Sequence, residues 1–342
     1  MDKHVIDIAQ QFIDGPIDDL EIIKGGLINS TYVVRSNGES FLLQRINNAV
    51  FQDAEAIQFN LQLVGKFLSD QHYPKVVLHL LSTPQGQSLV VDETGYSWRL
   101  LPYIANTDCH QLLPDDTFAS KAALALSEFH AVLSTMNPMQ LKIHLPEFTN
   151  FSARLNQFDH ALGNSSLDRQ SLAIYEIAFV KAHRELIQRF IDIQAQLPVR
   201  IIHGDPKLSN FLFHKGSSKV AALIDLDTLM PGTVLYDFGD MVRSFCNVQS
   251  EEDRGNGGFN VGIYRLLKNA YLVNLQSHLT PLEIDSMELA CATVILVQCV
   301  RFLTDYLNGD VYYQIDFPMH NLQRAQNQMQ LLEGFLKEVS LS

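Results

Sequence analysis

Two short apolar segments, each followed at once by a carboxylate, constrain the fold of this chain more than any other feature. The first leads through the letters IIHGD into Asp205, and the second leads through VAALID into Asp225. Asn210 follows Asp205 by five residues, and Asp225 follows it by twenty. Phosphoryl transfer from a nucleotide needs an aspartate that orients the attacking hydroxyl, and an amide oxygen and a second carboxylate that hold Mg²⁺. Asp205, Asn210 and Asp225 fit those roles in that order.

The prediction depends on the combination of these residues, because a single aspartate at a strand end is commonly a turn residue. The triplet Asp237-Phe238-Gly239 has the composition of a kinase metal site, but it lies 32 residues after Asp205. In the kinase pattern the metal aspartate follows an apolar strand about 20 residues on, where this chain has Asp225. Asp237 is therefore expected to brace the site or to cap a helix. His203 is expected to orient the loop by hydrogen bonding.

The first hundred residues have the pattern of strands joined by tight turns. Strands are expected at residues 22–24, 31–35 and 41–46, then at 76–81, 88–91 and 96–104, with a helix over residues 54–69 between the two groups. Asn37-Gly38 separates two β-rich runs and predicts a hairpin, because both turn residues need positive φ.

Beyond residue 106 the pattern becomes helical. Asp115 or Asp116 can cap a helix that ends near residue 133, and further helices are expected over residues 171–194, from Thr280 to about 307, and over 316–336. The letters TPLE from Thr280 have the form of a capping box. The chain is therefore predicted to be α+β, with a small β-rich N-terminal lobe over residues 1–103 and a larger helical lobe over residues 104–342.

Composition excludes several classes of protein. The formal net charge of −13 argues against a nucleic-acid partner. No uninterrupted apolar run reaches the length of a membrane span, so no membrane contact is expected. The four cysteines have neither disulfide-framework nor zinc-site spacing. A reduced, cytoplasmic enzyme is the simplest interpretation.

Longer motifs resemble those of the aminoglycoside-phosphotransferase and choline-kinase-like superfamily, which has the protein-kinase fold. Within it the chain is most similar to the N-acetylhexosamine 1-kinases. The matching stretches are GGLINSTYVV, FLLQRINNAVF, WRLLPYI, HGDPKLSNFLF, IDLDTLMPGTVLYDFGD, VRFLTDYLNGDVYY and HNLQRAQNQMQLL. The resemblance implies a two-lobed kinase that uses ATP and Mg²⁺ to phosphorylate a small sugar.

The resemblance also implies where the nucleotide binds. Residues 25–31 should lie over the ATP phosphates, with contacts from Gly25, Gly26, Asn29, Ser30 and Thr31. The adenine should lie against the linker of residues 101–104, and its expected contacts are Pro102, Tyr103 and Ile104.

One departure from the family pattern concerns the third strand. Kinases place a lysine there, paired with a glutamate of the following helix, whereas this chain has Gln44 and Arg45. The two side chains lie on opposite faces of a strand, so only one can face the nucleotide. The sequence leaves open which one does. Arg45 is the only cation and is the candidate phosphate contact, and Glu55 is the only carboxylate inside the helix.

The acceptor side is expected to involve Asp227 and Arg301. In an extended strand Asp227 would point to the same side as Asp225, where it could bind metal or a sugar hydroxyl, or brace a turn. Arg301 and Asp305 are spaced for a helix-surface ion pair. The helix around Arg301 is otherwise apolar, so a charge there suits a ligand, and the resemblance implies that Arg301 contacts the sugar.

Two rival functions remain open at this point. One is a kinase of another small hydroxyl acceptor, such as an amino alcohol or an aminoglycoside. The other is a nucleotide-binding pseudokinase, which the missing lysine supports and the intact Asp205, Asn210 and Asp225 oppose.

Overall fold

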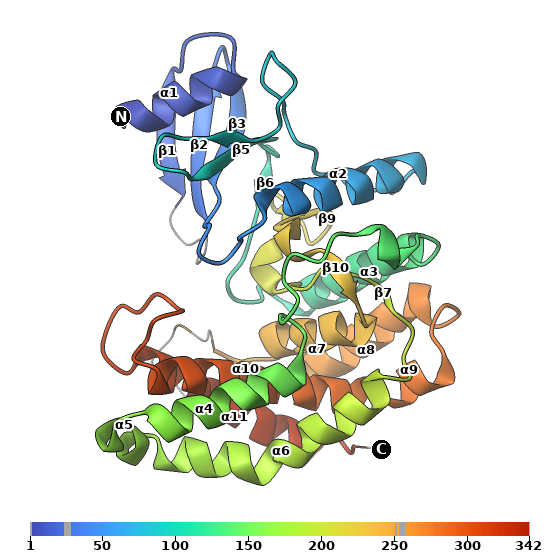
Figure 1. Cartoon of the computed structure of the whole chain (residues 1–342). Coiled ribbons are helices and arrows are strands. Elements are labelled where there is room, and N and C mark those ends of the chain that lie inside the picture. Colours follow the sequence, from blue (N-terminus) through green and yellow to red (C-terminus); the bar gives the residue numbers. More distant parts are fainter. Residues whose placement is uncertain (1, 24–28, 250–251, 253–257, 342) are drawn as a thin grey trace.

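An antiparallel sheet forms the N-terminal lobe of the computed structural model, which describes residues 2–23, 29–249, 252 and 258–341 (Figure 1). The strands are arranged in the order β1-β2-β3-β5-β4. Their bounds are β1 (Asp19–Ile23), β2 (Ser30–Ser36), β3 (Glu39–Arg45), β4 (Val90–Val91) and β5 (Ser97–Pro102). The hairpin at Asn37-Gly38 is confirmed, because both residues have positive φ (52° and 80°) and Ser36 pairs with Glu39.

One face of this sheet packs against α1 (Lys3–Phe12), a helix that was not expected from the sequence. Its buried residues, Val5, Ile8, Ala9 and Phe12, follow helical spacing, a signal that could have identified it. They form one core with Val34, Leu43, Trp98 and Leu100 of the sheet. Residues two apart on a strand share a face. Gln44 and Arg99, which follow Leu43 and Trp98, therefore point to the opposite face, toward the C-terminal lobe.

The helix α2 (Ala54–Asp70) connects the two lobes, and its C-terminal half belongs to the core of the C-terminal lobe through Leu61, Val64 and Leu68. The strand expected at residues 76–81 is absent. Val76 donates its N–H to Ala221 and Leu81 donates to Leu100, so the two ends of this segment bond to different lobes. No single strand runs beside residues 76–81, so this apolar segment does not form the repeated backbone hydrogen bonds of a β-strand.

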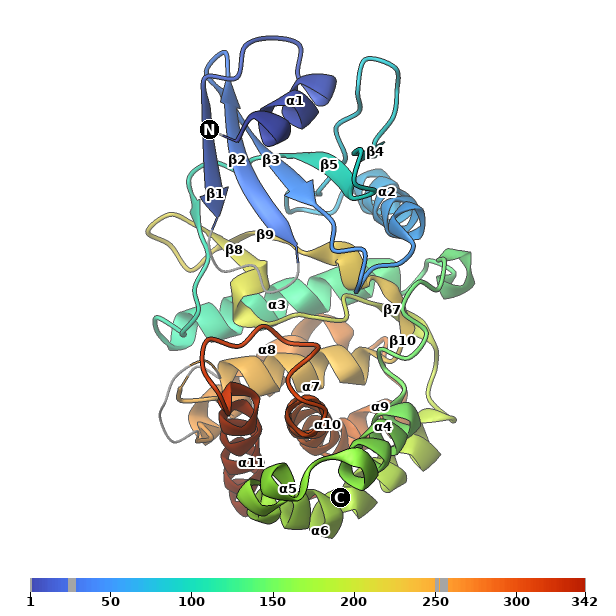
Figure 2. The same ribbon diagram turned by 60° about the vertical axis from the view of Figure 1, so that its left-hand side comes forward.

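The C-terminal lobe is mainly helical and lies below the sheet (Figures 1 and 2). Its α-helices are α3 (Asp116–Leu133), α4 (Phe151–Asn164), α5 (Leu167–Leu172), α6 (Ile174–Gln194), α7 (Val234–Phe245), α8 (Val261–Leu275), α9 (Pro281–Asp285), α10 (Met287–Leu307) and α11 (His320–Glu338). Asp115 caps α3 as expected. The capping box at Thr280 is confirmed, but it opens the short α9, after which α10 begins. The last helix begins at His320, because Met319 has a positive φ of 72°.

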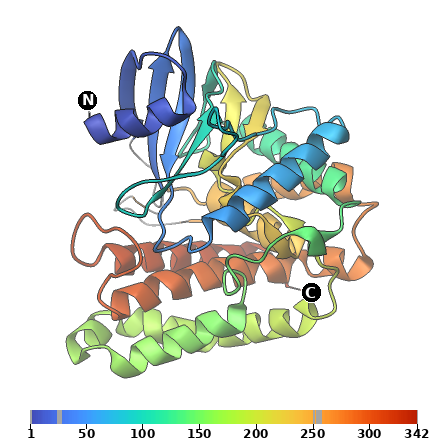
Figure 3. The ribbon, with the colours of Figure 1, turned by 45° about the horizontal axis from the view of Figure 1, so that its top comes forward.

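The helix α10 is central to this lobe, and α4, α6, α7 and α11 pack around it (Figure 3). Among the described residues it is the one helix that is long and apolar enough to span a membrane. Polar residues interrupt its sequence, so no apolar run in it is as long as a membrane span. Of its most apolar window, 78% is buried inside the fold. That burial is typical of a core helix, and the apolar residues are explained by packing.

Two small sheets lie between the helices and the N-terminal lobe. One pairs β7 (Arg200–Ile202) with β10 (Met230–Gly232), and the other has the order β6-β8-β9. The bounds of the second sheet are β6 (Thr107–Asp108), β8 (Phe211–His214) and β9 (Val220–Leu223). The four cysteines form no disulfide, as their spacing predicted. The chain therefore has the two-lobed protein-kinase-like fold, and the turns after β7 and β9 meet where the lobes join.

Candidate active site

The turns that follow β7 and β9 carry Asp205 and Asp225, and hydrogen bonds hold the two turns together. The ring Nε2 of His203 lies 3.0 Å from the carbonyl oxygen of Ile224. The N–H of Ile224 donates to the carbonyl of Asn210 at 2.9 Å. Asn210 ends a 3₁₀ turn (η2, Leu208–Asn210) and donates its amide nitrogen to the carboxylate of Asp205 at 3.0 Å. The structure thus brings the three residues of the sequence motif into one connected unit.

Asp237, the aspartate of the second triplet, braces the turn that carries Asp205. Its carboxylate accepts hydrogen bonds from the backbone N–H groups of His203 and Gly204, at 2.7 and 2.8 Å. The Nε2 of His130 lies 2.8 Å from the same carboxylate, and Asp237 is fully buried. This is the bracing role expected of Asp237. Burial of the His203 ring lowers its pKa, so the ring stays neutral.

Gly204 is required by the geometry of this turn. Its φ is +86°, and a Cβ built there would lie 2.6 Å from the carbonyl oxygen of Thr228. We expect Gly204→Ala to lower the free energy of unfolding by on the order of 3 kcal/mol, from strain and steric clash together. Gly216→Ala is the matched control, because Gly216 has a φ of +70° but nothing within 4 Å of its Cβ position. Urea unfolding of both variants measures the difference, and equal losses would contradict the clash.

The ammonium group of Lys207 contacts Asp205 directly, at 2.7 Å from Oδ2. Burial opposes ionisation of Asp205, but the charge of Lys207 outweighs it and lowers the pKa of Asp205. Lys207 lies inside the HGDPK motif, yet sequence reasoning assigned it no role. A lysine two residues from a candidate catalytic aspartate was the available signal. Asp205 is therefore ionised at neutral pH and can accept a hydrogen bond from an acceptor hydroxyl.

Asp225 lies in a left-handed backbone conformation, with a φ of 60°, and its side chain is exposed. Loss of solvation next to the surrounding protein atoms, and then the negative charge of Asp227, raise the pKa of Asp225 to about 6. Such crowding of carboxylates favours a bound cation. Asn210 donates from its amide nitrogen, and within the described chain no hydrogen bond reaches its amide oxygen. Asn210 and Asp225 thus offer the oxygen ligands that Mg²⁺ prefers, and they fit that ion.

No group of three His, Cys, Asp or Glu side chains converges as a closed metal centre in the part of the chain that the structure describes. A site made of one amide oxygen and one carboxylate therefore leaves most coordination positions for water and for the phosphates of a nucleotide.

Asp227 lies elsewhere than expected. The left-handed Asp225 is followed by a 3₁₀ turn (η3, Leu226–Thr228), so the two aspartates do not share one side of an extended strand, and that expectation is wrong. The Asp227 side chain is only 1% exposed. It forms an ion pair with Arg99 at 2.7 Å and accepts a hydrogen bond from the side chain of Asn29 at 2.9 Å.

The predicted nucleotide loop is described only in part, because Gly25 and Gly26 lie outside the described residues. Asn29 accepts a hydrogen bond from the N–H of Asn47, and Thr31 accepts one from the side chain of Gln44 at 3.1 Å. Ser30 lies on the opposite face of the sheet, where it accepts from Arg45 at 3.2 Å.

The structure decides between Gln44 and Arg45. Arg45 stacks on Tyr96, 4.7 Å from the ring centre, on the face of the sheet that α1 covers. Gln44 lies on the other face, where its side-chain oxygen accepts from Arg99 at 2.8 and 3.0 Å. Among the described residues of this sheet, the cation that reaches the C-terminal lobe is therefore Arg99, for which the sequence indicated at most a bracing role beside the linker.

The linker between the lobes follows β5. Pro102 is the last residue of β5, Tyr103 is exposed, and Ile104 packs on the core of the C-terminal lobe. The N–H of Tyr103 bonds weakly to Ser40 at 3.4 Å, and the carbonyl of Ile104 accepts from Thr107. Part of the backbone expected to contact adenine is thus engaged within the protein.

A cluster of arginine and tyrosine side chains lies on the helices, and its Tyr236 interacts electrostatically with both Asp205 and Arg301. Arg301 of α10 donates to Gln298 and lies over the rings of Phe148 and Tyr313, at 5.4 and 5.8 Å. Burial and the nearby charge of Arg301 lower the pKa of Arg154 on α4. Arg301 therefore lies beside a tyrosine ring, and Arg154 lies within range of its charge.

Asp305 does not pair with Arg301. Its carboxylate accepts hydrogen bonds from the N–H groups of Val311, Tyr312 and Tyr313, at 2.8–2.9 Å. Asp305 thereby holds the segment after α10 in place and sets Tyr313 beside Arg301.

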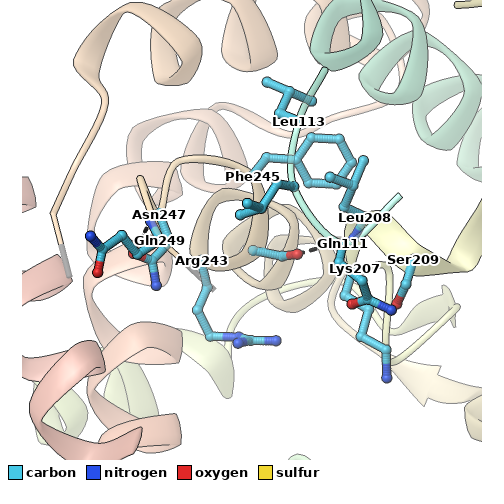
Figure 4. Close-up of a pocket in the computed structure, with 11 residues that line it drawn as sticks. Gln111, Leu113, Lys207, Leu208, Ser209, Arg243, Phe245, Asn247 and Gln249 are labelled. Atoms are coloured by element: carbon cyan, nitrogen blue, oxygen red, sulfur yellow. Dashed lines mark hydrogen bonds between the residues drawn. The ribbon is translucent and has the colours of Figure 1, made fainter. Parts of the chain in front are cut away.

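A pocket opens beside the turn that carries Asp205. Its lining includes Lys207, Arg243, Gln111 and Asn247. The ends of the Lys207 and Arg243 side chains lie on the same side of the pocket (Figure 4). Arg243 forms an ion pair with Asp240 at 2.7 Å.

Comparison with known proteins agrees with this geometry. A model of the phosphotransferase enzyme family matches residues 19–262, well over half of the chain.

Among solved structures, an aminopropanol kinase associated with a microcompartment superposes with a TM-score of 0.68 at 15% identity, covering 98% of this chain and 99% of that one. A spectinomycin phosphotransferase in complex with ADP and spectinomycin has a TM-score of 0.59 at 13% identity, covering 97% and 92%. An ethanolamine kinase from Plasmodium vivax has a TM-score of 0.59 at 14% identity, covering 91% and 82%. At these identities the superpositions establish the fold.

Proposed function

The chain belongs to the phosphotransferase enzyme family and is an ATP-dependent small-molecule kinase, and from that premise we propose that its acceptor is an N-acetylhexosamine, phosphorylated at the anomeric hydroxyl. The observation that supports the proposal is the connected unit of Asp205, Asn210 and Asp225, together with Tyr236, which interacts electrostatically with both Asp205 and Arg301.

The acceptor side argues against cationic acceptors. Arg154 and Arg301 carry positive charges that no described carboxylate pairs with at hydrogen-bond distance, and a further basic residue, Lys207, contacts Asp205 itself. An amino alcohol or an aminoglycoside would place an ammonium group near these cations. A neutral sugar offers hydroxyl and acetamide oxygens, which suit the five donors of a guanidinium. Tyrosine rings beside Arg301 suit the apolar face of a sugar ring.

The mechanism follows from the positions of this chain's residues. Asp205 accepts a hydrogen bond from the anomeric hydroxyl and turns its oxygen toward the γ-phosphorus of ATP. Because the pKa of Asp205 is lowered, Asp205 is ionised and can take up the hydroxyl proton as the oxygen–phosphorus bond forms. Asn210 and Asp225 would hold Mg²⁺, which neutralises charge on the phosphates. Lys207 keeps Asp205 ionised between turnovers.

The acceptor can be identified with a panel of compounds incubated with ATP and Mg²⁺, with ADP release as the measure. The panel contains N-acetylglucosamine, N-acetylgalactosamine, their 1-O-methyl glycosides, an amino alcohol and an aminoglycoside. We expect turnover with the two free sugars alone. Phosphorylation of a 1-O-methyl glycoside at the rate of the free sugar would overturn the anomeric assignment. Turnover with only the amines would support the rival function that the structural neighbours exemplify.

Arg301 provides a test of the acceptor side. We expect Arg301→Ala to raise the KM for the sugar by about tenfold or more, because a hydrogen bond from a charged group contributes roughly 1.5–3 kcal/mol. The KM for ATP should change much less. Arg184→Ala is the matched control, since Arg184 pairs with the exposed Asp159 on the outside of the helical lobe. An equal rise in both KM values would place Arg301 outside the acceptor side.

A further inference from the structure

Asp227 receives contacts from two separate segments of the N-terminal lobe, although it belongs to the C-terminal lobe. Arg99 of β5 pairs with one carboxylate oxygen at 2.7 Å, and the side chain of Asn29, just before β2, donates to the other at 2.9 Å. His144 lies 2.7 Å from the backbone carbonyl of Asp227. Across the junction of the lobes, one carboxylate oxygen therefore forms an ion pair and the other accepts a hydrogen bond.

The contacts of Arg99 continue across the sheet. Its guanidinium donates twice to Gln44, whose amide nitrogen donates to Thr31 at 3.1 Å. The register places Thr31, Gln44 and Arg99 in one row across β2, β3 and β5. This row connects the strand that follows the predicted nucleotide loop to the turn that carries Asp225.

The same row explains the missing lysine. Gln44 occupies the face of β3 that points toward the other lobe, and it carries no charge. Arg99, one strand further, supplies the cation, and its carboxylate partner is on the turn after the candidate metal aspartate instead of on a helix. Arg45 is excluded from this role, because it lies on the face that α1 covers.

We propose that Arg99 and Asp227 are a positioning pair, which fixes Asn29 and Thr31, at the start of β2, relative to Asp225 and thereby sets the place of the donor phosphates. The inference rests on the proposed phosphoryl transfer at Asp205 and Asp225. In this role neither residue touches the acceptor. On the N-terminal side the pair is bonded to Asn29 directly and to Thr31 by way of Gln44. On the C-terminal side Asp227 belongs to the turn η3, which follows Asp225.

The environment of the pair supports a functional role over a purely stabilising one. Arg99 is 2% exposed and Asp227 is 1% exposed. Such pairs contribute little net stability, because desolvation opposes their attraction. In addition, the Nη1 of Arg99 and the Oδ1 of Asp227 are both buried without a hydrogen-bond partner among the described residues, which is unfavourable. A site built for stability alone would be expected to hold apolar side chains here.

A double-mutant cycle tests the proposal. Arg99→Gln, Asp227→Asn and the double variant are compared with the parent by calorimetric titration with Mg·ADP, in the absence of any acceptor. We expect each single variant to weaken Mg·ADP binding by about tenfold, and the double variant to match the singles, because the second change removes nothing further. The KM for ATP should rise in parallel, while the KM for the acceptor stays constant.

Three results would overturn the pairing. Multiplicative losses, about a hundredfold in the double variant, would show that the residues act independently. A change in the acceptor KM alone would make Asp227 an acceptor contact. A raised Mg²⁺ requirement in Asp227→Asn that Arg99→Gln lacks would make it a metal ligand. Because Mg·ADP binding is measured without an acceptor, a wrong acceptor assignment leaves this test intact.

Two further variants protect the test against loss of folding. Asn29→Ala removes a hydrogen bond to Asp227 but leaves the ion pair in place, and we expect it to weaken Mg·ADP binding severalfold; unchanged binding would count against the proposal. Arg35→Gln is the control, since Arg35 pairs with the exposed Asp19 and Glu21 within the N-terminal lobe and does not reach the other lobe. Its Mg·ADP affinity should equal that of the parent.

Discussion

Asp205→Asn should retain the fold and bind nucleotide normally, yet lose kcat by about 10²–10⁴-fold, the range of a positioned acid–base group. The substitution keeps the size of the side chain and removes its charge. An amide cannot accept the proton of the attacking hydroxyl, and it frees Lys207 from its partner at 2.7 Å. Initial rates with saturating ATP and acceptor measure the loss.

The thermal stability and the Mg·ADP affinity of Asp205→Asn serve as controls for its structure. Asn210 still has the backbone carbonyl of residue 205 to bond to, at 2.8 Å, so the turn should remain in place. Near-normal turnover in a folded variant would remove Asp205 from the mechanism and leave the unit without a base.

Asp225→Ala should abolish Mg²⁺-dependent turnover, with a loss on the order of 10³-fold or more, because metal stabilisation of transferred charge contributes several kcal/mol. Asn210→Ala should raise the Mg²⁺ concentration needed for half-maximal rate without abolishing activity. Rates measured across a Mg²⁺ titration distinguish the two effects. Binding of Mn²⁺ in the presence of ADP, followed by electron paramagnetic resonance, reports on the site independently of turnover.

Asp237→Asn is the informative companion variant, because Asp237 is the alternative metal aspartate by composition. Its carboxylate is fully buried and accepts from two backbone N–H groups and a histidine. We expect lower thermal stability but retained Mn²⁺ binding. The assignment of the metal residue would be wrong if Asp237→Asn lost Mn²⁺ binding while Asp225→Ala kept it.

The chemistry-bearing turns were predictable because the information is local. Asp205 and Asn210 lie five residues apart, and each aspartate comes within three residues of the end of its strand, so local spacing is enough to place them. The hairpin at Asn37-Gly38 and the caps at Asp115 and Thr280 were predictable for the same reason: each depends on residues within one turn of the chain.

Contacts between distant parts of the chain were not predictable in this way. The partner of Arg99 is Asp227, and no spacing rule relates a strand residue to a carboxylate in the other lobe. The left-handed conformation of Asp225 turned Asp227 away from the direction that strand geometry implied. The expected strand at residues 76–81 failed because its ends bond to different lobes, which is a property of the tertiary fold.

The residues proposed to contact the acceptor and those proposed to carry the chemistry come from different elements of the fold. Arg154 and Arg301 project from α4 and α10, whereas Asp205 and Asp225 lie on turns held by backbone hydrogen bonds and by Asp237. Substitutions on the helices leave those turns in place. Recognition can therefore be redesigned separately from catalysis: a library restricted to positions on α4, α10 and the segment after α10 can be selected for sugar analogues while the phosphoryl-transfer residues stay unchanged.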